Sequence, residues 1–292
     1  MTYPAAFWPG ILGILFLVAG LFTYRRDVES SRSDMFGLAA LGPVFVAAAL
    51  AAFAGEHFSS TAGIASIVPK FIPAPMFIAY FVGVAHLAAA TSFVARRYVS
   101  LSSLCLAVMF ALFVALMDLP GAFRKPELHI VWSLAARQAT FAMGGLALFA
   151  TVTRADQPRR AETIATIARF WTAFVLVFYG IENILFPQYA PGVPDVTPVA
   201  KWIPMPSMIA YITGGLLVAF GIAMFIGKHG AAAAKWAGVL MTLLTITLYV
   251  PQWMIARDVG QQINGINFVF DTLLFAGTMF VIGRAIPDPK TA

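Results

Sequence analysis

The chain consists of long apolar stretches separated by short polar segments. A helix that crosses the hydrocarbon core of a bilayer, roughly 30 Å thick, needs about 20 mainly apolar residues. Nine stretches approach or reach this length, at residues 7–24, 35–55, 76–95, 100–118, 130–152, 163–183, 207–227, 235–254 and 264–283. Most carry no charge at their centre, and they lack the alternating pattern of β-barrel strands. The pattern predicts an all-α, polytopic membrane protein with nine transmembrane helices.

Composition strengthens this prediction. Of 292 residues, 60% are hydrophobic and 11% are charged, whereas soluble domains average about 25% charged residues. A water-soluble fold has too little interior to bury so much apolar surface. The single cysteine, Cys105, excludes an intrachain disulfide or dithiol relay and is expected to be a small packing residue.

The basic residues are scattered through short loops, a distribution that indicates membrane topology and not a nucleic-acid surface. With nine crossings, one side of the membrane collects twelve of them: Arg25, Arg26, Arg32, Arg96, Arg97, Arg154, Arg159, Arg160, Lys228, Lys235, Arg284 and Lys290. The other side collects five: Lys70, Arg124, Lys125, Lys201 and Arg257. Because cytoplasmic loops are enriched in Lys and Arg, we predict a cell (inner) membrane protein with its N-terminus outside and its C-terminus in the cytoplasm.

An internal repeat divides the chain. Residues 70–83 (KFIPAPMFIAYFVG) align without a gap with residues 201–214 (KWIPMPSMIAYITG), sharing eight of fourteen residues at a spacing of 131. Pro120 and Pro251 show the same spacing. Each copy has four predicted helices, an even number, so both copies enter the membrane in the same direction as parallel repeats. The predicted units are a leading helix with its basic loop (1–34), two four-helix repeats (35–155 and 156–285) and a cytoplasmic tail (286–292).

These motifs resemble those of the DoxX-like membrane proteins. The similarity lies in Gly55-Glu-His-Phe58 at the end of one helix, in the Trp/Phe-Ile-Pro entry to the next helix, and in the stretches 190–194 and 267–277. The family is usually a single four-helix unit, whereas this chain carries two. The resemblance implies a helical-bundle membrane subunit, in some members linked to quinone-reactive oxidoreductases.

Two charged residues are expected at membrane depth. Arg137 and Asp271 each lie four residues before a matching phenylalanine, Phe141 and Phe275, so they occupy the same position of the fourth helix in their repeats. Burial of a charge in a bilayer costs roughly 2.5 to 3.5 kcal/mol. The first interpretation is an ion pair that staples the repeats together. The alternative is that Arg137 anchors an anionic or carbonyl-bearing ligand and Asp271 orients it or relays protons.

Further candidate ligand-binding residues lie near the predicted outer interface. They are Glu56, His57, Glu182, Asn183 and Asn267. A carboxylate beside an imidazole is suited to proton exchange near neutral pH. Helix capping or ordering of the long loop that follows Asn183 would explain the same residues without any chemistry.

The histidines do not form a metal-ligand pattern. His57 and His129 are predicted to be external, His86 to lie within the membrane and His229 to be cytoplasmic, and none are spaced i, i+4 on one helix. We therefore predict neither a metal site nor a haem. His86 corresponds to Leu217 in the second repeat and is predicted to be a packing residue with its polar atoms satisfied.

The loops 58–75 and 186–206 are apolar and rich in proline, which predicts lids over the bundle. The leading hypothesis is a subunit that binds a lipidic or quinone-type molecule in an outward cavity beneath these lids, accessory to a membrane redox complex. Because the chain has no dithiol, metal or flavin motif, redox chemistry would need a partner subunit or a bound cofactor, and a stand-alone enzyme is not expected. The alternatives are a transporter or channel built on the repeats, and a structural or assembly subunit.

Overall fold

The structure is a computed structural model that describes residues 4–30 and 37–287. Helices occupy all nine apolar stretches within these residues. The long helices are α1 (Pro4–Thr23), α3 (Gly42–Ser59), α5 (Pro75–Ala95), α6 (Val99–Phe113), α8 (His129–Thr153), α9 (Pro158–Leu185), α10 (Pro206–Ile226), α11 (Gly230–Leu244) and α13 (Val259–Ala285). The short ones are α2 (Arg25–Ser30), η1 (Gly37–Leu41), α4 (Thr61–Ile67), α7 (Leu119–Arg124) and α12 (Val250–Met254). The described residues contain no strand beyond one isolated bridge, between Tyr189 and Pro198.

Seven helical spans in the described part of the chain are long and apolar enough to cross a membrane. They are Gly37–Ser59, Pro75–Ala95, Val99–Arg124, Pro158–Leu185, Pro206–Ile226, Gly230–Met254 and Val259–Ala285. The apolar part of α1 is shorter, from Phe7 to Thr23, and α8 is not among the seven. The protein is therefore an all-helical membrane protein.

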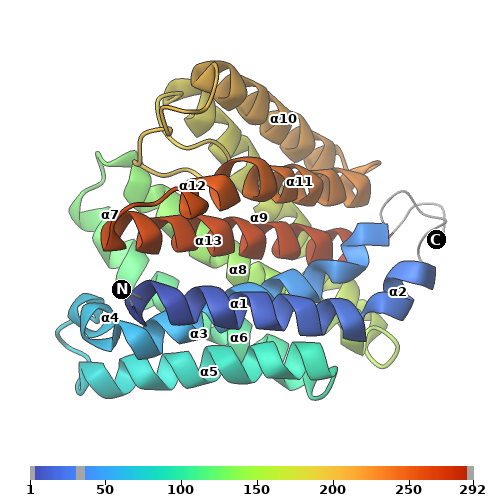
Figure 1. Ribbon diagram of the computed structural model, residues 1–292. Coiled ribbons are helices and arrows are strands. Elements are labelled where there is room, and N and C mark those ends of the chain that lie inside the picture. Colours follow the sequence, from blue (N-terminus) through green and yellow to red (C-terminus); the bar gives the residue numbers. More distant parts are fainter. Residues whose placement is uncertain (1–3, 31–36, 288–292) are drawn as a thin grey trace.

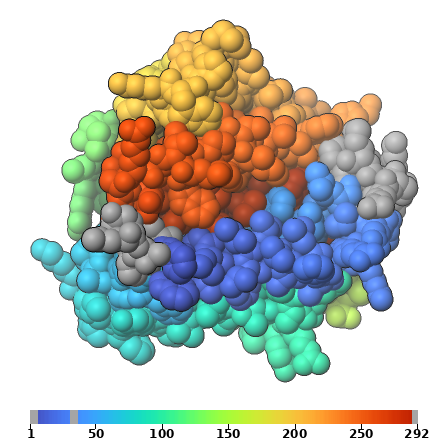
Figure 2. Space-filling model, viewed as in Figure 1, coloured from blue at the N-terminus to red at the C-terminus, as the bar shows by residue number. Residues whose placement is uncertain are grey.

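Helices α3 and α13 form the centre of the bundle. They cross closely where Gly42 meets Gly277, because a Cβ on Gly277 would lie 2.8 Å from the backbone oxygen of Gly42. Small residues at such crossings allow the dispersion contacts that hold membrane helices together. Helix α1 packs along α3 and also contacts α5 and α13, so it covers one face of the molecule (Figures 1 and 2).

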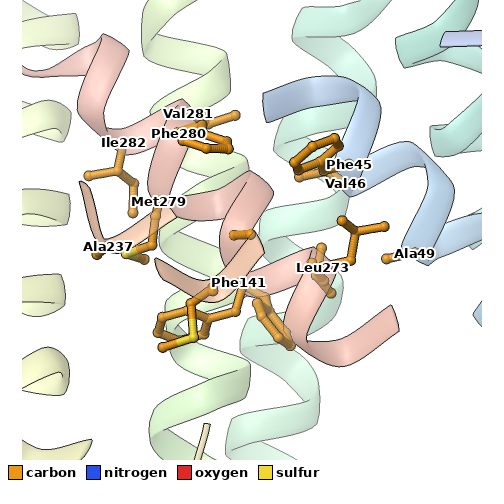
Figure 3. Packing of buried hydrophobic residues seen from close by; sticks show 14 of the residues in the cluster. Phe45, Val46, Ala49, Phe141, Ala237, Leu273, Met279, Phe280, Val281 and Ile282 are labelled. Carbon is orange, nitrogen blue, oxygen red and sulfur yellow. The ribbon is translucent and has the colours of Figure 1, made fainter. Parts of the chain in front are cut away.

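A continuous apolar core joins the two halves of the chain. Phe45 of α3, Phe141 of α8 and Phe280 of α13 are all buried in it (Figure 3). The ring centroids of Phe45 and Phe280 are 5.9 Å apart, and those of Phe141 and Phe275 are 6.4 Å apart. Aromatic contacts of this kind contribute about 0.5 to 1.5 kcal/mol each beyond area burial, so α13 is held firmly against both α3 and α8.

Two local distortions recur at the spacing of 131 residues. Ala74 and Met205 adopt the left-handed conformation just before α5 and α10. Two π-helical segments, η2 (Val114–Asp118) and η3 (Thr245–Tyr249), follow α6 and α11. A proline inside a helix has no N–H and clashes with the carbonyl four residues earlier. A π-segment just before Pro120 and Pro251 accommodates that clash.

The two ends of the bundle differ. Helices α4, α7 and α12 and the loop before α10 lie at one end (Figure 1), and α2 lies at the other. At the α2 end, Arg96 pairs with Asp27 at 3.1 Å and Arg154 donates a hydrogen bond to the backbone oxygen of Ala285. These arginines belong to the basic set predicted to be cytoplasmic. Two other members of that set, Arg32 and Lys290, lie outside the described residues.

Candidate functional site

A cavity of about 680 Å³ is lined mainly by the first half of the chain, by α3, α4, α5, α6 and α8, and also by α13. Its walls are mainly apolar. The apolar lining includes Phe53, Ile64, Ile67, Val68, Pro69, Ile72, Ile78, Phe81, Val82, Met109, Phe110, Phe113, Leu116, Met117 and Phe141. Five residues of the first predicted lid line this cavity: Ile64, Ile67, Val68, Pro69 and Ile72.

Five of the seven candidate site residues line this cavity: Glu56, His57, Arg137, Asn267 and Asp271. Glu56 and His57 come from the last turn of α3, Arg137 comes from α8, and Asn267 and Asp271 come from α13. The cavity therefore combines a large apolar volume with one polar cluster, the usual composition of a site for a small molecule.

Arg137 and Asp271 form an ion pair with 2.6 Å between Nη1 and Oδ2. The predicted staple is thus present, joining α8 to α13. The two side chains keep 16% and 22% of their surface accessible, and both line cavities. The pair is therefore buried within the protein yet within reach of a bound molecule, so its structural role leaves the role of ligand anchor open.

Glu56 and His57 are oriented by neighbouring groups. Asn267 Nδ2 lies 3.4 Å from Glu56 Oε1, which links α13 to α3. His57 Nδ1 lies 2.8 Å from the backbone oxygen of Phe53. A carbonyl oxygen can only accept, so Nδ1 carries the proton, and in the neutral imidazole Nε2 is left as an acceptor.

His86 is the residue that the sequence analysis underestimated. It is buried, as predicted, but neither of its ring nitrogens has a hydrogen-bond partner, so the prediction of a satisfied packing histidine is wrong. The ring lies among aromatic neighbours, 5.2 Å from the His57 ring and 6.1 Å from the Phe110 ring. Gln138 Oε1, also on the cavity wall, is likewise unpartnered. Buried polar atoms without partners are rare and require an explanation.

A second, smaller cavity of about 180 Å³ shares Arg137, Asn267 and Asp271 with the large one. The rest of its lining includes Asp195 and Thr197 from the loop before α10, and Asn264, Phe268 and Thr272 from α13. This lining is mostly polar. The ion pair therefore stands between an apolar cavity and a polar one.

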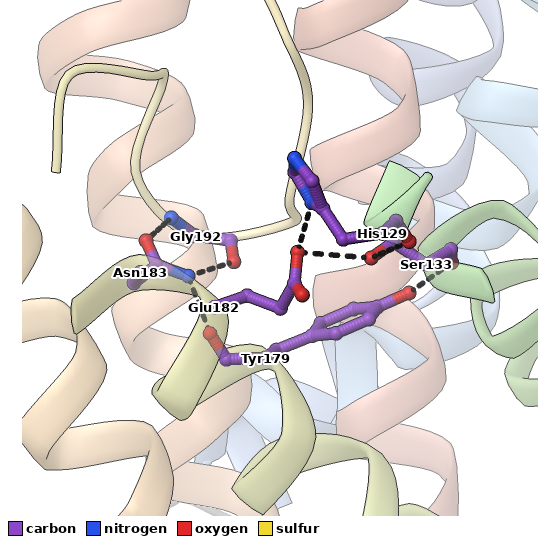
Figure 4. Close-up of polar contacts among 6 residues, drawn as sticks. All are labelled: His129, Ser133, Tyr179, Glu182, Asn183 and Gly192. Atoms are coloured by element: carbon purple, nitrogen blue, oxygen red, sulfur yellow. Dashed lines mark hydrogen bonds and ion pairs between the residues drawn. The ribbon is translucent and has the colours of Figure 1, made fainter. Parts of the chain in front are cut away.

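Glu182 lies in a different cluster, at the contact between α9 and α8 (Figure 4). Its Oε2 is 2.6 Å from His129 Nδ1 and 3.3 Å from the hydroxyl of Ser133. The Tyr179 hydroxyl donates to the backbone oxygen of Ser133 at 2.9 Å. These contacts fasten α9 to α8, and a stacked Phe186 ring, 4.0 Å from the His129 ring, covers the pair. The sequence places His129 outside the membrane but does not pair it with Glu182, because that contact depends on how α9 packs on α8.

Asn183 orders the long loop, as the alternative interpretation predicted. Its Nδ2 donates to the backbone oxygen of Gly192 at 2.9 Å, and its Oδ1 accepts from the Gly192 N–H at 2.8 Å (Figure 4). Glu182 and Asn183 therefore do not join the other five candidates in the large cavity.

No cluster of three or more His, Cys, Asp or Glu residues that suits a metal ion occurs among residues 4–30 and 37–287. Comparison of the chain with models of known protein families, with curated proteins and with solved structures finds no match.

Proposed function

We propose that this protein is a DoxX-like membrane subunit that binds a small lipidic, quinone-type molecule in the large cavity. The observation that carries the proposal is His86, which lines an apolar cavity of about 680 Å³ and whose two buried ring nitrogens have no hydrogen-bond partner. Leaving a buried polar group unpaired costs about 1 to 3 kcal/mol. A ligand that pairs with this imidazole removes the cost.

The cavity suits a molecule with an apolar body and carbonyl or hydroxyl groups. Its volume lies within the roughly 300 to 1,000 Å³ of small-molecule sites. Carbonyl oxygens would accept hydrogen bonds from Arg137 or His86, and hydroxyl groups would donate to His57 or Gln138. The aromatic and aliphatic lining would hold the ring and tail. Electron transfer would require a partner subunit or a bound cofactor, so the role proposed here is accessory.

The proposed architecture has nine crossings: a leading helix (1–34) followed by parallel repeats (35–155 and 156–285), with the N-terminus outside and the C-terminus cytoplasmic. The duplication is supported by the recurrent left-handed residues Ala74 and Met205 and by the two π-segments. The orientation is supported by Arg96 and Arg154, two members of the basic set, which lie at the α2 end of the bundle.

A transporter is the second candidate, and the polar cavity favours it. Two cavities that meet at the Arg137–Asp271 pair would provide a path if the pair opened. Intramembrane ion pairs beside cavities are typical of substrate and proton pathways. Transport predicts flux across sealed vesicles, which binding alone does not.

Equilibrium dialysis of the detergent-purified protein against decylubiquinone, with mass spectrometry of co-purified lipids, tests the binding proposal. We expect one bound molecule per chain and at least a tenfold weaker Kd in His86→Leu. His229→Leu is the matched control, since His229 precedes α11 and does not line the cavity, and it should bind normally. Unchanged binding in His86→Leu, or no binding to the unaltered protein, contradicts the proposal.

A further inference from the structure

The loop between α9 and α10 contains a segment that is buried along its whole length, Ala190–Pro194. Ala190 and Val193 are each only 6% exposed. Connecting loops normally run over the surface, because their backbone polar groups need water. This segment must therefore have found its partners inside the protein.

The segment lies against the second-half counterparts of cavity-lining residues. A Cβ on Gly192 would lie 2.9 Å from Leu244 Cδ1 and 3.4 Å from Met241 Sδ. Leu244 and Met241 stand 131 positions after Phe113 and Phe110, which line the large cavity. The segment thus fills the place in the second half where the first half is hollow.

A polar residue also occupies corresponding positions in the two halves. Asn183 in the second half and His57 in the first both pack on a glycine of the following helix. A Cβ on Gly214 would lie 3.2 Å from Asn183 Cβ, and one on Gly83 would lie 2.8 Å from His57 Cβ. Asn183 binds both the N–H and the C=O of Gly192, so it holds the segment from the position that His57 occupies beside the large cavity.

A second anchor comes from the π-segment. The Tyr249 hydroxyl donates to the backbone oxygen of Pro191, and Tyr249 is 1% exposed. Its counterpart 131 positions earlier is Asp118, one of whose carboxylate oxygens is buried without a partner. In the second half, the segment supplies a hydrogen-bond acceptor, the Pro191 carbonyl oxygen, to the polar side chain at this position.

We infer that the second half holds a copy of the ligand site that is permanently occupied by the chain's own segment Ala190–Pro194, called the plug below. This inference rests on the proposed function and the proposed duplication. The plug presents apolar side chains and two backbone carbonyls, those of Pro191 and Gly192, to its site. The ligand of the first half then belongs to the same class, an apolar molecule bearing carbonyl groups, and each chain binds one such molecule.

Cysteine accessibility tests the plug without any ligand. In a Cys105→Ser background, Phe113→Cys places a thiol on the wall of the large cavity and Leu244→Cys places one beneath the plug. We expect N-ethylmaleimide to alkylate Phe113→Cys at least tenfold faster than Leu244→Cys. Equal rates at the two positions would overturn the plug.

Loosening the plug should expose its site. Adding Asn183→Ala and Tyr249→Phe to Leu244→Cys should raise its alkylation rate at least fivefold and leave the rate at Phe113→Cys unchanged. Gln188→Ala, in the same loop but outside the plug, is the control and should change neither rate. If the loosened protein is folded and Leu244→Cys stays unreactive, the position is ordinary core and the inference is wrong.

Hydrogen exchange of the unaltered protein covers the case in which the loosened variant does not fold. The Gly192 amide donates to Asn183 inside the protein, so the peptide containing it should exchange at least a hundredfold more slowly than an exposed loop. Fast exchange of the peptide that contains Gly192 would contradict the inference that the plug is permanently bound. The binding proposal fails separately. If the large cavity does not bind decylubiquinone, this compound will not slow the alkylation of Phe113→Cys. That result does not depend on how fast Leu244→Cys reacts.

Discussion

At the scale of single residues, the Arg137–Asp271 pair allows a quantitative test. Removing one member of a buried ion pair costs about 3 to 5 kcal/mol, whereas replacing both by apolar residues is often nearly neutral. We expect Arg137→Met and Asp271→Leu each to lower the free energy of unfolding by about that amount, and the double variant to recover most of it. Thermal unfolding in detergent, analysed as a double-mutant cycle, measures the coupling.

The exposed pair between Arg25 and Glu29, at 2.8 Å on α2, is the control for this cycle. Their side chains are 73% and 42% exposed, so Arg25→Met should leave stability essentially unchanged, because solvent screens an exposed ion pair. If the losses of the two buried single variants simply added in the double variant, the pair would not be acting as a staple.

His86 should show opposite effects on stability and binding. His86→Leu installs the residue found at the corresponding position of the second half, Leu217, and removes two unpartnered polar atoms. We expect the melting temperature to stay the same or rise, because a buried polar group without a partner costs about 1 to 3 kcal/mol, while the Kd for decylubiquinone weakens at least tenfold.

His129→Leu is the comparison, because His129 is paired with a buried carboxylate. Glu182 has only 8% of its side-chain surface accessible, so loss of its partner should lower the melting temperature. A similar fall in His86→Leu would mean that His86 is a structural residue of the first half.

Part of the site could be predicted from the sequence. Arg137 and Asp271 were identified as a pair because a duplicated position carried opposite charges, and the structure confirms the contact. Gln138 and the unpartnered state of His86 were missed, since a cavity depends on what neighbouring helices leave empty, and no pattern within one helix records that. The Glu182–His129 contact was missed for a similar reason: it depends on how α9 packs on α8.

At the scale of helices, two adjacent glycines of α10 distinguish the effect of helix packing on stability from the effect of helix propensity. A Cβ on Gly214 would lie 2.6 Å from the backbone oxygen of Gly180 on α9, whereas a Cβ on Gly215 meets nothing within 4 Å. Gly214→Ala should therefore push α10 away from α9 and cost about 1 to 3 kcal/mol. Gly215→Ala should be neutral or slightly stabilising, because alanine favours helix.

Thermal unfolding of both variants in the same detergent provides the measurement. Equal effects at the two positions would show that the close approach of α9 and α10 does not contribute to stability. The same comparison bears on the plug, because Gly214 also packs against Asn183. Asn183 accepts a hydrogen bond from the Gly192 amide, so Gly214→Ala should also increase the rate of hydrogen exchange at Gly192.

The helices were largely predictable and their connections were not. All nine apolar stretches form helices within the described residues, because a mainly apolar run of about 20 residues has few other structures available in a bilayer. The π-segments and the buried course of Ala190–Pro194 were not foreseen. The sequence predicts that this loop is a lid like residues 58–75, but the space that the loop fills exists only because α11 and η3 pack around it.

At the scale of the whole molecule, the number of crossings depends on α8. This helix has 25 residues and, at 1.5 Å per residue, is about 38 Å long, enough to span a bilayer core. It is not among the seven clearly apolar spans because it carries Arg137 and Gln138, which face the cavity, and His129, which pairs with Glu182. A helix packed between α6, α9 and α13 can cross a bilayer with these residues, since they do not face lipid.

Reporter cysteines on either side of α8 test whether this helix is one of the nine proposed crossings. In a Cys105→Ser background, Lys125→Cys lies before α8 and Asp156→Cys lies after it, and both positions are exposed. If α8 spans the membrane, an impermeant maleimide added to intact cells labels Lys125→Cys and leaves Asp156→Cys unlabelled until the cells are opened. Labelling of both cysteines from one side would show that α8 does not cross, and the parallel arrangement of the two halves would then be wrong, because the first half would contain an odd number of crossings.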